Sequence, residues 1–133
     1  MTGIVVDSSA LVAMALGEDG WEVLDDIVGE YEAVVSAATL VETSMVIESR
    51  EGLVGAALLD EILRDGAVDV VEVDEPLARA AVRAWRHFGK GNHPASLNFG
   101  DCFVYALAKD SGLPILCLGN DFAQTDIEVL PAR

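Results

Sequence analysis

The sequence places four acidic residues beside predicted strand ends and helix starts, and these are Asp7, Glu42, Asp101 and Asp121. Carboxylates that gather in one place raise one another's pKa unless a cation neutralises them. A group of acids without histidine or cysteine favours a hard ion, Mg²⁺ or Mn²⁺, which activates water and stabilises the charge that develops on a phosphodiester. If the fold brings them together, the four acids predict a metal-dependent nuclease.

Each acid also has an ordinary structural explanation. Asp7 can cap a helix, and Glu42 can complete a capping box that begins at Thr39. Asp101 takes the third position of its helix, where the helix dipole favours negative charge, and Asp121 on its own is better explained as a turn residue. Capping does not explain why so many acids fall where ligands bind, so the shared site is the stronger interpretation.

Apolar runs separated by turn signals predict strands and helices in alternation. The strand candidates are residues 3–6, 31–36, 70–73, 115–118 and 127–130. Helices are predicted over residues 10–16, 39–50, 53–64 and 74–90, with a last one that begins after Asn98 and stops at Gly112. This alternation implies an α/β fold with a mainly parallel sheet of four to five strands and helices on both faces. Ligands bind beyond the carboxyl ends of such strands, where the four acids are expected.

The helix that carries Asp101 has the apolar spacing of a core-facing helix. The residues at this spacing are Phe99, Cys102, Phe103, Ala106 and Leu107. We expect them to face the core while Asp101 points into the crevice. Asn98 can cap the helix and orient Asp101, and Ser8 can donate a hydrogen bond to a carboxylate or a phosphate. Both residues are expected to support the acids and not to react.

Composition bounds the class of protein. The chain has 133 residues, of which 52% are apolar, so we expect one folded domain over residues 1–133. Its 8 basic and 23 acidic residues give a net charge of −15, which disfavours adhesion to nucleic acid or anionic membrane. Cys102 and Cys117 lie in apolar segments without metal-ligand spacing, as buried thiols in a reducing compartment do. With no leader and no long apolar run, we expect a cytoplasmic chain without a membrane partner.

Four segments together resemble the PIN domain, and within it the VapC-type toxins of bacterial toxin–antitoxin pairs. They are VVDSSAL around Asp7, TLVET around Glu42, LNFGDCFVYALAK around Asp101 and GNDFAQTDI around Asp121. The resemblance extends from residue 4 to about residue 127 and implies a Mg²⁺-dependent endoribonuclease, with Mn²⁺ as a substitute, that forms a homodimer. It also implies a small antitoxin that docks with an apolar segment and places a basic residue in the acid cluster. Residues 10–16 and 53–63 are candidates for that contact.

The resemblance also assigns roles to individual acids. Asp7, Glu42 and Asp101 match the three core acids, which bind the metal and act in catalysis, and Asp121 matches a fourth, more variable one. Asp126 matches a family acid as well, but it lies further from the strand end. We expect Asp126 to be a peripheral turn residue.

A chain of this charge needs a local basic patch to hold RNA. Half of the basic residues fall on one predicted helix at i, i+4, i+7 and i+11, and these are Arg79, Arg83, Arg86 and Lys90. Such a stripe can follow phosphates, or it can be a solvated face that pairs with acids. Trp85 lies off the stripe and is assigned to packing or to a subunit contact.

Other classes of protein fit less well. A haloacid-dehalogenase phosphatase needs a second aspartate two positions after Asp7, where this chain has Ser9. A receiver domain needs a lysine after a late strand, and ILCLGNDF supplies none. The remaining alternative is a non-catalytic PIN-like module that binds RNA or a protein partner and keeps its acids as helix caps.

Overall fold

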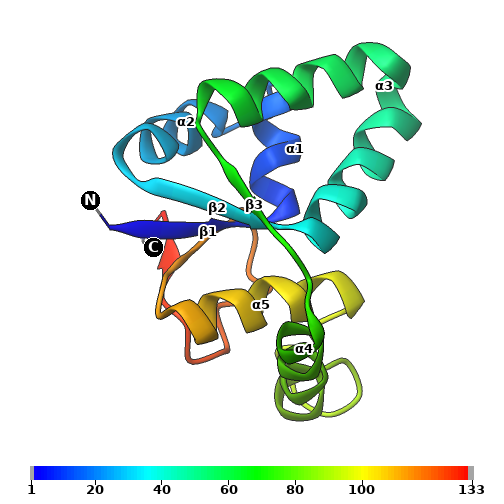
Figure 1. Cartoon of the computed structure of the whole chain (residues 1–133), viewed down its shortest axis with the longest axis vertical. Coiled ribbons are helices and arrows are strands. Elements are labelled where there is room, and N and C mark those ends of the chain that lie inside the picture. The colour runs from blue at the N-terminus through cyan, green and yellow to red at the C-terminus, as the bar shows by residue number, and fades with distance from the viewer. Residues whose placement is uncertain (1, 132–133) are drawn as a thin grey trace.

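A parallel sheet lies between two layers of helices in the computed structural model, which describes residues 2–131 (Figure 1). The strands are β1 (Gly3–Val6), β2 (Glu32–Ser36), β3 (Asp69–Val71), β4 (Ile115–Leu116) and β5 (Val129–Leu130). Their order in the sheet is β3-β2-β1-β4-β5, and every neighbouring pair is parallel. The structure confirms the α/β fold and all five predicted strands, although the last two are shorter than their apolar runs.

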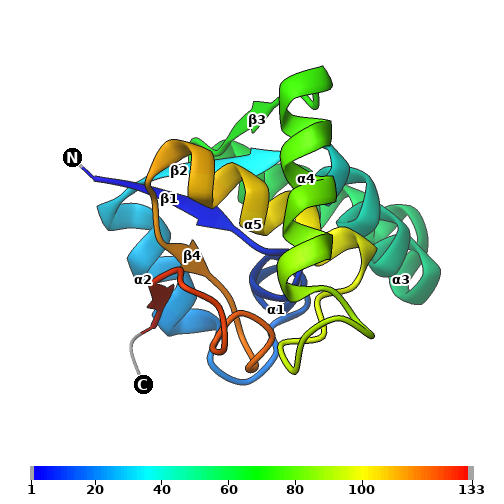
Figure 2. The same cartoon turned by 90° about the horizontal axis from the view of Figure 1, so that it is seen from below.

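The helices divide between the two faces of the sheet (Figures 1 and 2). In the described part of the chain they are α1 (Ser8–Leu16), α2 (Trp21–Glu30), α3 (Ala37–Asp65), α4 (Glu75–Phe88) and α5 (Phe99–Ser111). The first three cover one face, and α4 and α5 cover the other. Helix α2 was missing from the prediction, although Trp21, Leu24 and Val28 follow Gly20 at helical spacing and two of them are buried.

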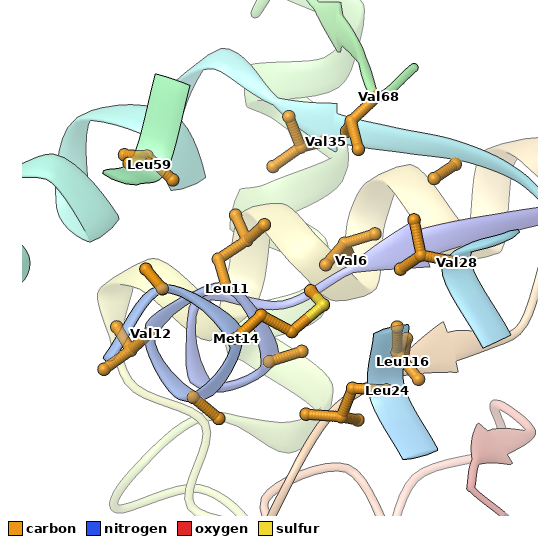
Figure 3. Close-up of a cluster of buried hydrophobic side chains, with 14 of the residues drawn as sticks. Val6, Leu11, Val12, Met14, Leu24, Val28, Val35, Leu59, Val68 and Leu116 are labelled. Atoms are coloured by element: carbon orange, nitrogen blue, oxygen red, sulfur yellow. The ribbon is translucent and has the colours of Figure 1, made fainter. Parts of the chain in front are cut away.

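Each face of the sheet has its own hydrophobic core. Figure 3 shows the first core, in which Leu11 and Met14 of α1 pack against Val6 and Leu116 of the sheet. Helix α1 is buried from Ala10 to Ala15, so its apolar surface is enclosed within the domain. The prediction that residues 10–16 offer an apolar surface to a partner is therefore wrong.

One prediction about α3 is confirmed and another is wrong. The expected helices at 39–50 and 53–64 are both present and meet at a kink at Gly52, whose φ of 62° and ψ of −149° are not helical and suit only glycine. The helix begins after Ser36, whose hydroxyl accepts the Ala38 N–H at 3.2 Å, and not at Thr39. Glu42 is thus the sixth residue of the helix, beyond the reach of a cap. A capping box cannot explain this acid.

Helix α5 differs from the prediction at its first residue and in the extent of its core face. Phe99, the first residue of the helix, is 81% exposed and does not face the core, whereas Cys102, Ala106 and Leu107 are buried as expected. The core face also includes Val104 and Ala108, which the apolar spacing had left out.

The structure also bears on the two cysteines and on membrane-spanning helices. Cys102 and Cys117 are both buried and form no disulfide in the described part of the chain, in agreement with the prediction of buried thiols. Among residues 2–131, no helix combines the length and the apolar character that crossing a bilayer requires.

Candidate functional site

The parallel sheet brings the predicted acids to the same edge. Asp7 follows β1, Glu42 lies on the helix that follows β2, and Asp121 lies in the turn beyond β4. These strands are neighbours in the sheet, so their carboxyl ends meet. Asp101 lies near the start of α5, and the negative charges of Asp7, Asp121 and Glu42 each raise its pKa. The structure therefore brings Asp7, Glu42 and Asp121 within electrostatic reach of Asp101.

Asp7 is buried, and only one of its two carboxylate oxygens accepts hydrogen bonds in the described structure. Its Oδ2 accepts the Ser9 backbone N–H at 3.1 Å and the Ser9 hydroxyl at 2.6 Å. Its Oδ1 is buried without a hydrogen-bond partner in the described structure. Burial raises the pKa of Asp7, the Ser9 hydrogen bonds lower it, and the charge of Glu42 raises it further. An orphaned carboxylate oxygen of this kind calls for a ligand.

The serine that holds Asp7 is Ser9 and not Ser8. The Ser9 hydroxyl donates to Asp7 and accepts the Leu118 N–H at 3.0 Å, so it joins the start of α1 to the loop after β4. Ser8 contributes through its backbone, which lowers the pKa of Asp7 slightly. Sequence reasoning missed Ser9 because its second partner is 109 residues away.

Asp101 is held by a capping box, as predicted from Asn98. The Asn98 side chain accepts the Asp101 N–H at 2.9 Å, and Asp101 Oδ2 accepts the Asn98 N–H at 3.0 Å. These bonds fix the carboxylate and leave Oδ1 to meet a ligand. Burial is the main cause that raises the pKa of Asp101 to about 7; the Asn98 N–H lowers it, and the neighbouring acids add to the rise.

Glu42 reaches the cluster across a close approach between α3 and α5. An ideal Cβ placed on Gly100 would overlap the Glu42 carboxylate. Only glycine at this position lets the carboxylate lie against the backbone next to Asp101. Sequence reasoning missed Gly100. The available signal was a glycine within the predicted helix, directly before Asp101, because glycine weakens a helix and its presence there needs a reason.

Asp121 and Asp126 have different surroundings. Asp121 is exposed in the turn after β4, and its charge reaches Asp101. Asp126 accepts a hydrogen bond from the Tyr105 hydroxyl at 2.5 Å and forms an ion pair with Lys109 at 2.7 Å. These contacts, Lys109 first, lower the pKa of Asp126. Asp126 is thus bound to the later part of α5, which agrees with its predicted peripheral place.

The donor set suits a hard divalent cation in its chemistry. The acids offer oxygen atoms only, which Mg²⁺ and Mn²⁺ prefer. Asp7 and Asp101 have raised pKa values and Asp7 Oδ1 lacks a partner, so a cation would relieve both burial and repulsion. Within residues 2–131, no three carboxylate, imidazole or thiol groups already stand as a closed ligand set. Side chains would have to draw together around an ion.

The PIN domain family model matches residues 4–128, nearly the whole chain. The chain belongs to the PIN-domain family. Ribonuclease VapC30 of Mycobacterium tuberculosis is 47% identical over 125 residues, which cover 93% of this chain and 95% of that protein. Ribonuclease VapC of Mycolicibacterium smegmatis is 46% identical over 125 residues, which cover 93% of this chain and 97% of that protein. The recognition of a VapC-type PIN domain is therefore confirmed.

Solved structures of the same fold agree with this PIN domain at low sequence identity. The crystal structure of Mycobacterium tuberculosis VapC20, described as a sarcin–ricin loop cleaving toxin, has a TM-score of 0.75 at 20% identity. It covers 93% of this chain and 95% of that one. VapBC2 from Rickettsia felis, in a crystal structure bound to a DNA fragment from its promoter, has a TM-score of 0.76 at 9% identity. The match covers 96% of this chain and 97% of that one. At this identity the likeness establishes the fold.

The basic residues of the predicted stripe have different surroundings in this PIN domain. All four residues, Arg79, Arg83, Arg86 and Lys90, are exposed. Arg79 pairs with Glu75 one turn away at 2.7 Å. Arg83 lines a cleft of about 200 Å³ with His87 and Lys109, whereas Lys90 lines a different hollow. Contact of the stripe with RNA stays a prediction.

The hollow at Lys90 lies between α4 and α5. We name it the aromatic groove and define it by Trp85, Lys90, Asn98, Phe99, Cys102 and Phe103. It has a volume of about 610 Å³ and an almost wholly apolar lining. Trp85 is 50% exposed at its edge, and Phe99 is more exposed still. Asn98 and Cys102 lie on either side of Asp101 in the sequence, but none of the four acids lines the groove.

Proposed function

We propose that this PIN domain is a metal-dependent endoribonuclease and the toxin of a type II toxin–antitoxin pair. The observation that carries the proposal is the placing of the acids at one edge of the sheet, where the Glu42 carboxylate lies against Gly100 beside Asp101 and Asp7 Oδ1 is buried without a hydrogen-bond partner in the described structure. Relatives at 46–47% identity are named ribonucleases, which supports an RNA substrate. Cleavage of RNA phosphodiester bonds in the cytoplasm is the function that joins these observations.

Asp7, Glu42 and Asp101 would hold Mg²⁺, or Mn²⁺ as a substitute, with Asp121 at the exposed side of the cluster. When bound, such an ion lowers the pKa of a water and offsets the charge that develops on the phosphate. The Ser9 hydroxyl holds Asp7 by Oδ2 and leaves Oδ1 free for the ion. The Asn98 capping box does the same for Asp101. These contacts fix the carboxylates before substrate arrives, so that less reorganisation is needed during the reaction.

The antitoxin partner is proposed from the solved relatives and from the surface of α3. Several of the similar structures are toxin–antitoxin complexes. In this chain, α3 leaves large apolar side chains in solvent, and these are Val41, Met45, Leu53 and Val54. An apolar antitoxin segment would cover them, in agreement with the prediction for residues 53–63. We also propose that the toxin is a homodimer, as the family resemblance implies.

The test is cleavage of total cellular RNA by purified, antitoxin-free protein with Mg²⁺, with chelator, and as the Asp101→Asn variant. Asp110→Asn is the matched control, since it makes the same change at an exposed position of the same helix. We expect discrete fragments from the wild type and from Asp110→Asn, and none from the other two samples. Cleavage by Asp101→Asn at the wild-type rate would contradict the proposal and indicate contaminating nuclease.

The alternative function is a binding module without catalysis, in which the acids are helix caps. Two of the acids do serve as caps, since Asp7 accepts the Ser9 N–H and Asp101 shares a box with Asn98. Glu42 does not, because its helix begins after Ser36 and Glu42 is its sixth residue. Thermal denaturation separates the two functions. Mg²⁺ should raise the melting temperature of the wild type and not of Asp101→Asn, whereas caps alone predict no rise in either protein.

A further inference from the structure

We propose that the aromatic groove is the surface through which two copies of this chain form the homodimer, related by a two-fold axis that passes the middle of α4 at right angles to the helix. The inference rests on the proposed homodimer and names the surface that it uses. It gives Trp85 the second of the two roles that the sequence left open, a subunit contact. None of the four acids lines the groove, so the contact between copies does not use them.

Helix α4 has a wider apolar face than α5 covers. The residues that it buries are Leu77, Ala80, Ala81 and Ala84. On the groove side this face continues with Val82 and Trp85, three residues apart, which are 44% and 50% exposed. A surface helix normally presents polar residues to solvent beyond its buried stripe. Large apolar side chains gathered beside a hollow mark a contact with a further partner.

The surface has both a hollow and a projecting side chain. Phe99 stands exposed on the lining of the groove, and an edge-to-face contact with Phe103 holds its ring. Trp85 is also held, since a Cβ added to Gly89 would overlap its ring. A two-fold axis brings the same patch to both sides of an interface, so Phe99 of each copy can enter the hollow of the other. Aromatic side chains of this kind supply most of the affinity at the centre of an interface.

The charges along α4 match those of an antiparallel copy. The helix starts with Glu75 after the capping Asp74, and its last turn carries Arg86 and His87. A two-fold axis at right angles to the helix lays the two copies of α4 antiparallel. The acidic start of each helix then lies toward the basic end of the other, and the two helix dipoles oppose each other. This arrangement gives the contact between copies charges of opposite sign.

The net charge of −15 opposes contact between copies, and it does so least at the layer of α4 and α5. Residues 75–111, which form these two helices and their connection, include five of the eight basic residues. They include three of the 23 acids, Glu75, Asp101 and Asp110, so their net charge is +2 and −17 remains on the rest of the chain. Copies that meet through this layer keep most of their negative charge apart.

The groove suits a protein better than a nucleic acid strand. Among the described residues that line it, Lys90 alone is charged, whereas a strand of RNA is held through several phosphates. The core of an interface between proteins is poor in charge and rich in aromatic residues. The antitoxin is proposed to cover α3, which lies on the other face of the sheet (Figure 1). A second copy is therefore the proposed partner that the groove accommodates.

Sedimentation velocity of antitoxin-free protein over a range of concentrations tests the inference. Val82→Glu places a carboxylate in the groove, where the two-fold axis brings it toward its own copy. We expect the dissociation constant of the dimer to rise at least about 100-fold, because like charges in a contact are strongly unfavourable. Val54→Glu is the matched control, since it makes the same change at an exposed position of α3, outside the groove, and should leave the dimer intact.

Two further measurements do not depend on a new charge. Phe99→Ala removes an exposed ring and should raise the dissociation constant about ten-fold or more. Trp21→Phe leaves Trp85 as the only tryptophan, so its emission reports on the groove directly. Dilution of that protein should shift the emission to longer wavelengths as the dimer separates and water reaches the ring. Melting curves show whether each variant is folded.

The outcomes separate the groove from the homodimer. If Val82→Glu and Phe99→Ala dimerise as tightly as the wild type, the inference fails and the homodimer stands. Separation of the dimer by Val54→Glu alone would assign the contact to α3 and overturn the inference. A wild type that is monomeric at every concentration would overturn the inference and the homodimer together. If the emission of Trp85 in that monomer shifted on addition of a single-stranded oligoribonucleotide, the groove would bind RNA instead.

Discussion

Glu42 and Gly100 are in direct contact across two helices. The Glu42 carboxylate on α3 takes the space that a side chain at position 100 of α5 would fill. The contact places Glu42 beside the peptide that leads into Asp101. The close approach of the two acids therefore requires that residue 100 carries no methyl group. This dependence gives a way to disturb the acid cluster without removing any acid.

Gly100→Ala should abolish most of the RNA cleavage while the fold survives. The three atoms nearest the new Cβ all belong to the flexible end of Glu42, which can swing away, and alanine is the better helix former. We expect at least a ten-fold loss of cleavage and a smaller rise in melting temperature on addition of Mg²⁺. Gly29→Ala is the control, since nothing lies within 4 Å of its added Cβ. Equal cleavage by the two variants would show that the position of Glu42 is unimportant.

Ser9→Ala should disturb Asp7 more than Ser8→Ala does. The Ser9 hydroxyl donates to Asp7 and accepts the Leu118 N–H, so its loss leaves two polar groups without this partner. We expect destabilisation of about 1–2 kcal/mol and weaker cleavage. Ser8→Ala should stay within about 0.5 kcal/mol of the wild type. Urea denaturation of the three proteins measures the difference, and a larger effect from Ser8 would restore the original prediction.

The metal-free protein should owe part of its pH dependence to Asp101. Its pKa is raised from 3.8 to about 7 in the fold, so on acidification the folded state takes up the proton before the unfolded state does. The free energy of unfolding should therefore rise as pH falls from about 7.5 to about 4.5. Asp101→Asn removes this contribution, and it should make the protein more stable at pH 7.5 by at least about 1 kcal/mol, or roughly 3–6 °C.

Melting curves in chelator at both pH values test this prediction. Asp110→Asn again serves as the control, because it removes one negative charge from the same helix at an exposed position. The difference in melting temperature between Asp101→Asn and Asp110→Asn should shrink at the lower pH. A difference that grows as the pH falls would mean that Asp101 is ionised at little cost in the fold.

Asp126→Asn should leave cleavage intact. This acid is bound to Tyr105 and Lys109 on α5, and its contacts are partly exposed, so its loss should cost less than about 1 kcal/mol. Asp121→Asn should instead reduce cleavage, because the charge of Asp121 reaches Asp101. Cleavage rates and melting temperatures of the two variants show which of the two acids is needed for cleavage and which affects only stability. Loss of cleavage in Asp126→Asn alone would exchange the roles of these acids.

The sequence by itself determined the features that depend on neighbouring residues. Apolar runs bounded by turn residues predicted all five strands, and the Asn98 cap and the Gly112 stop of α5 followed from local hydrogen bonding. The alternation of strands and helices then implied the parallel sheet and, through it, the edge where the acids meet. Helix α2 was missed although its apolar spacing was present in the sequence.

Only the tertiary structure decided the features that depend on distant segments. Ser9 became a support for Asp7 because β4 brings Leu118 to its hydroxyl, and Gly100 became necessary because α3 brings Glu42 against it. The raised pKa of Asp101 needs burial and charges from three other segments. Phe99 has helical core spacing, but its side chain is exposed. Spacing along one helix specifies a face, and what packs against that face is settled by residues far away in the chain.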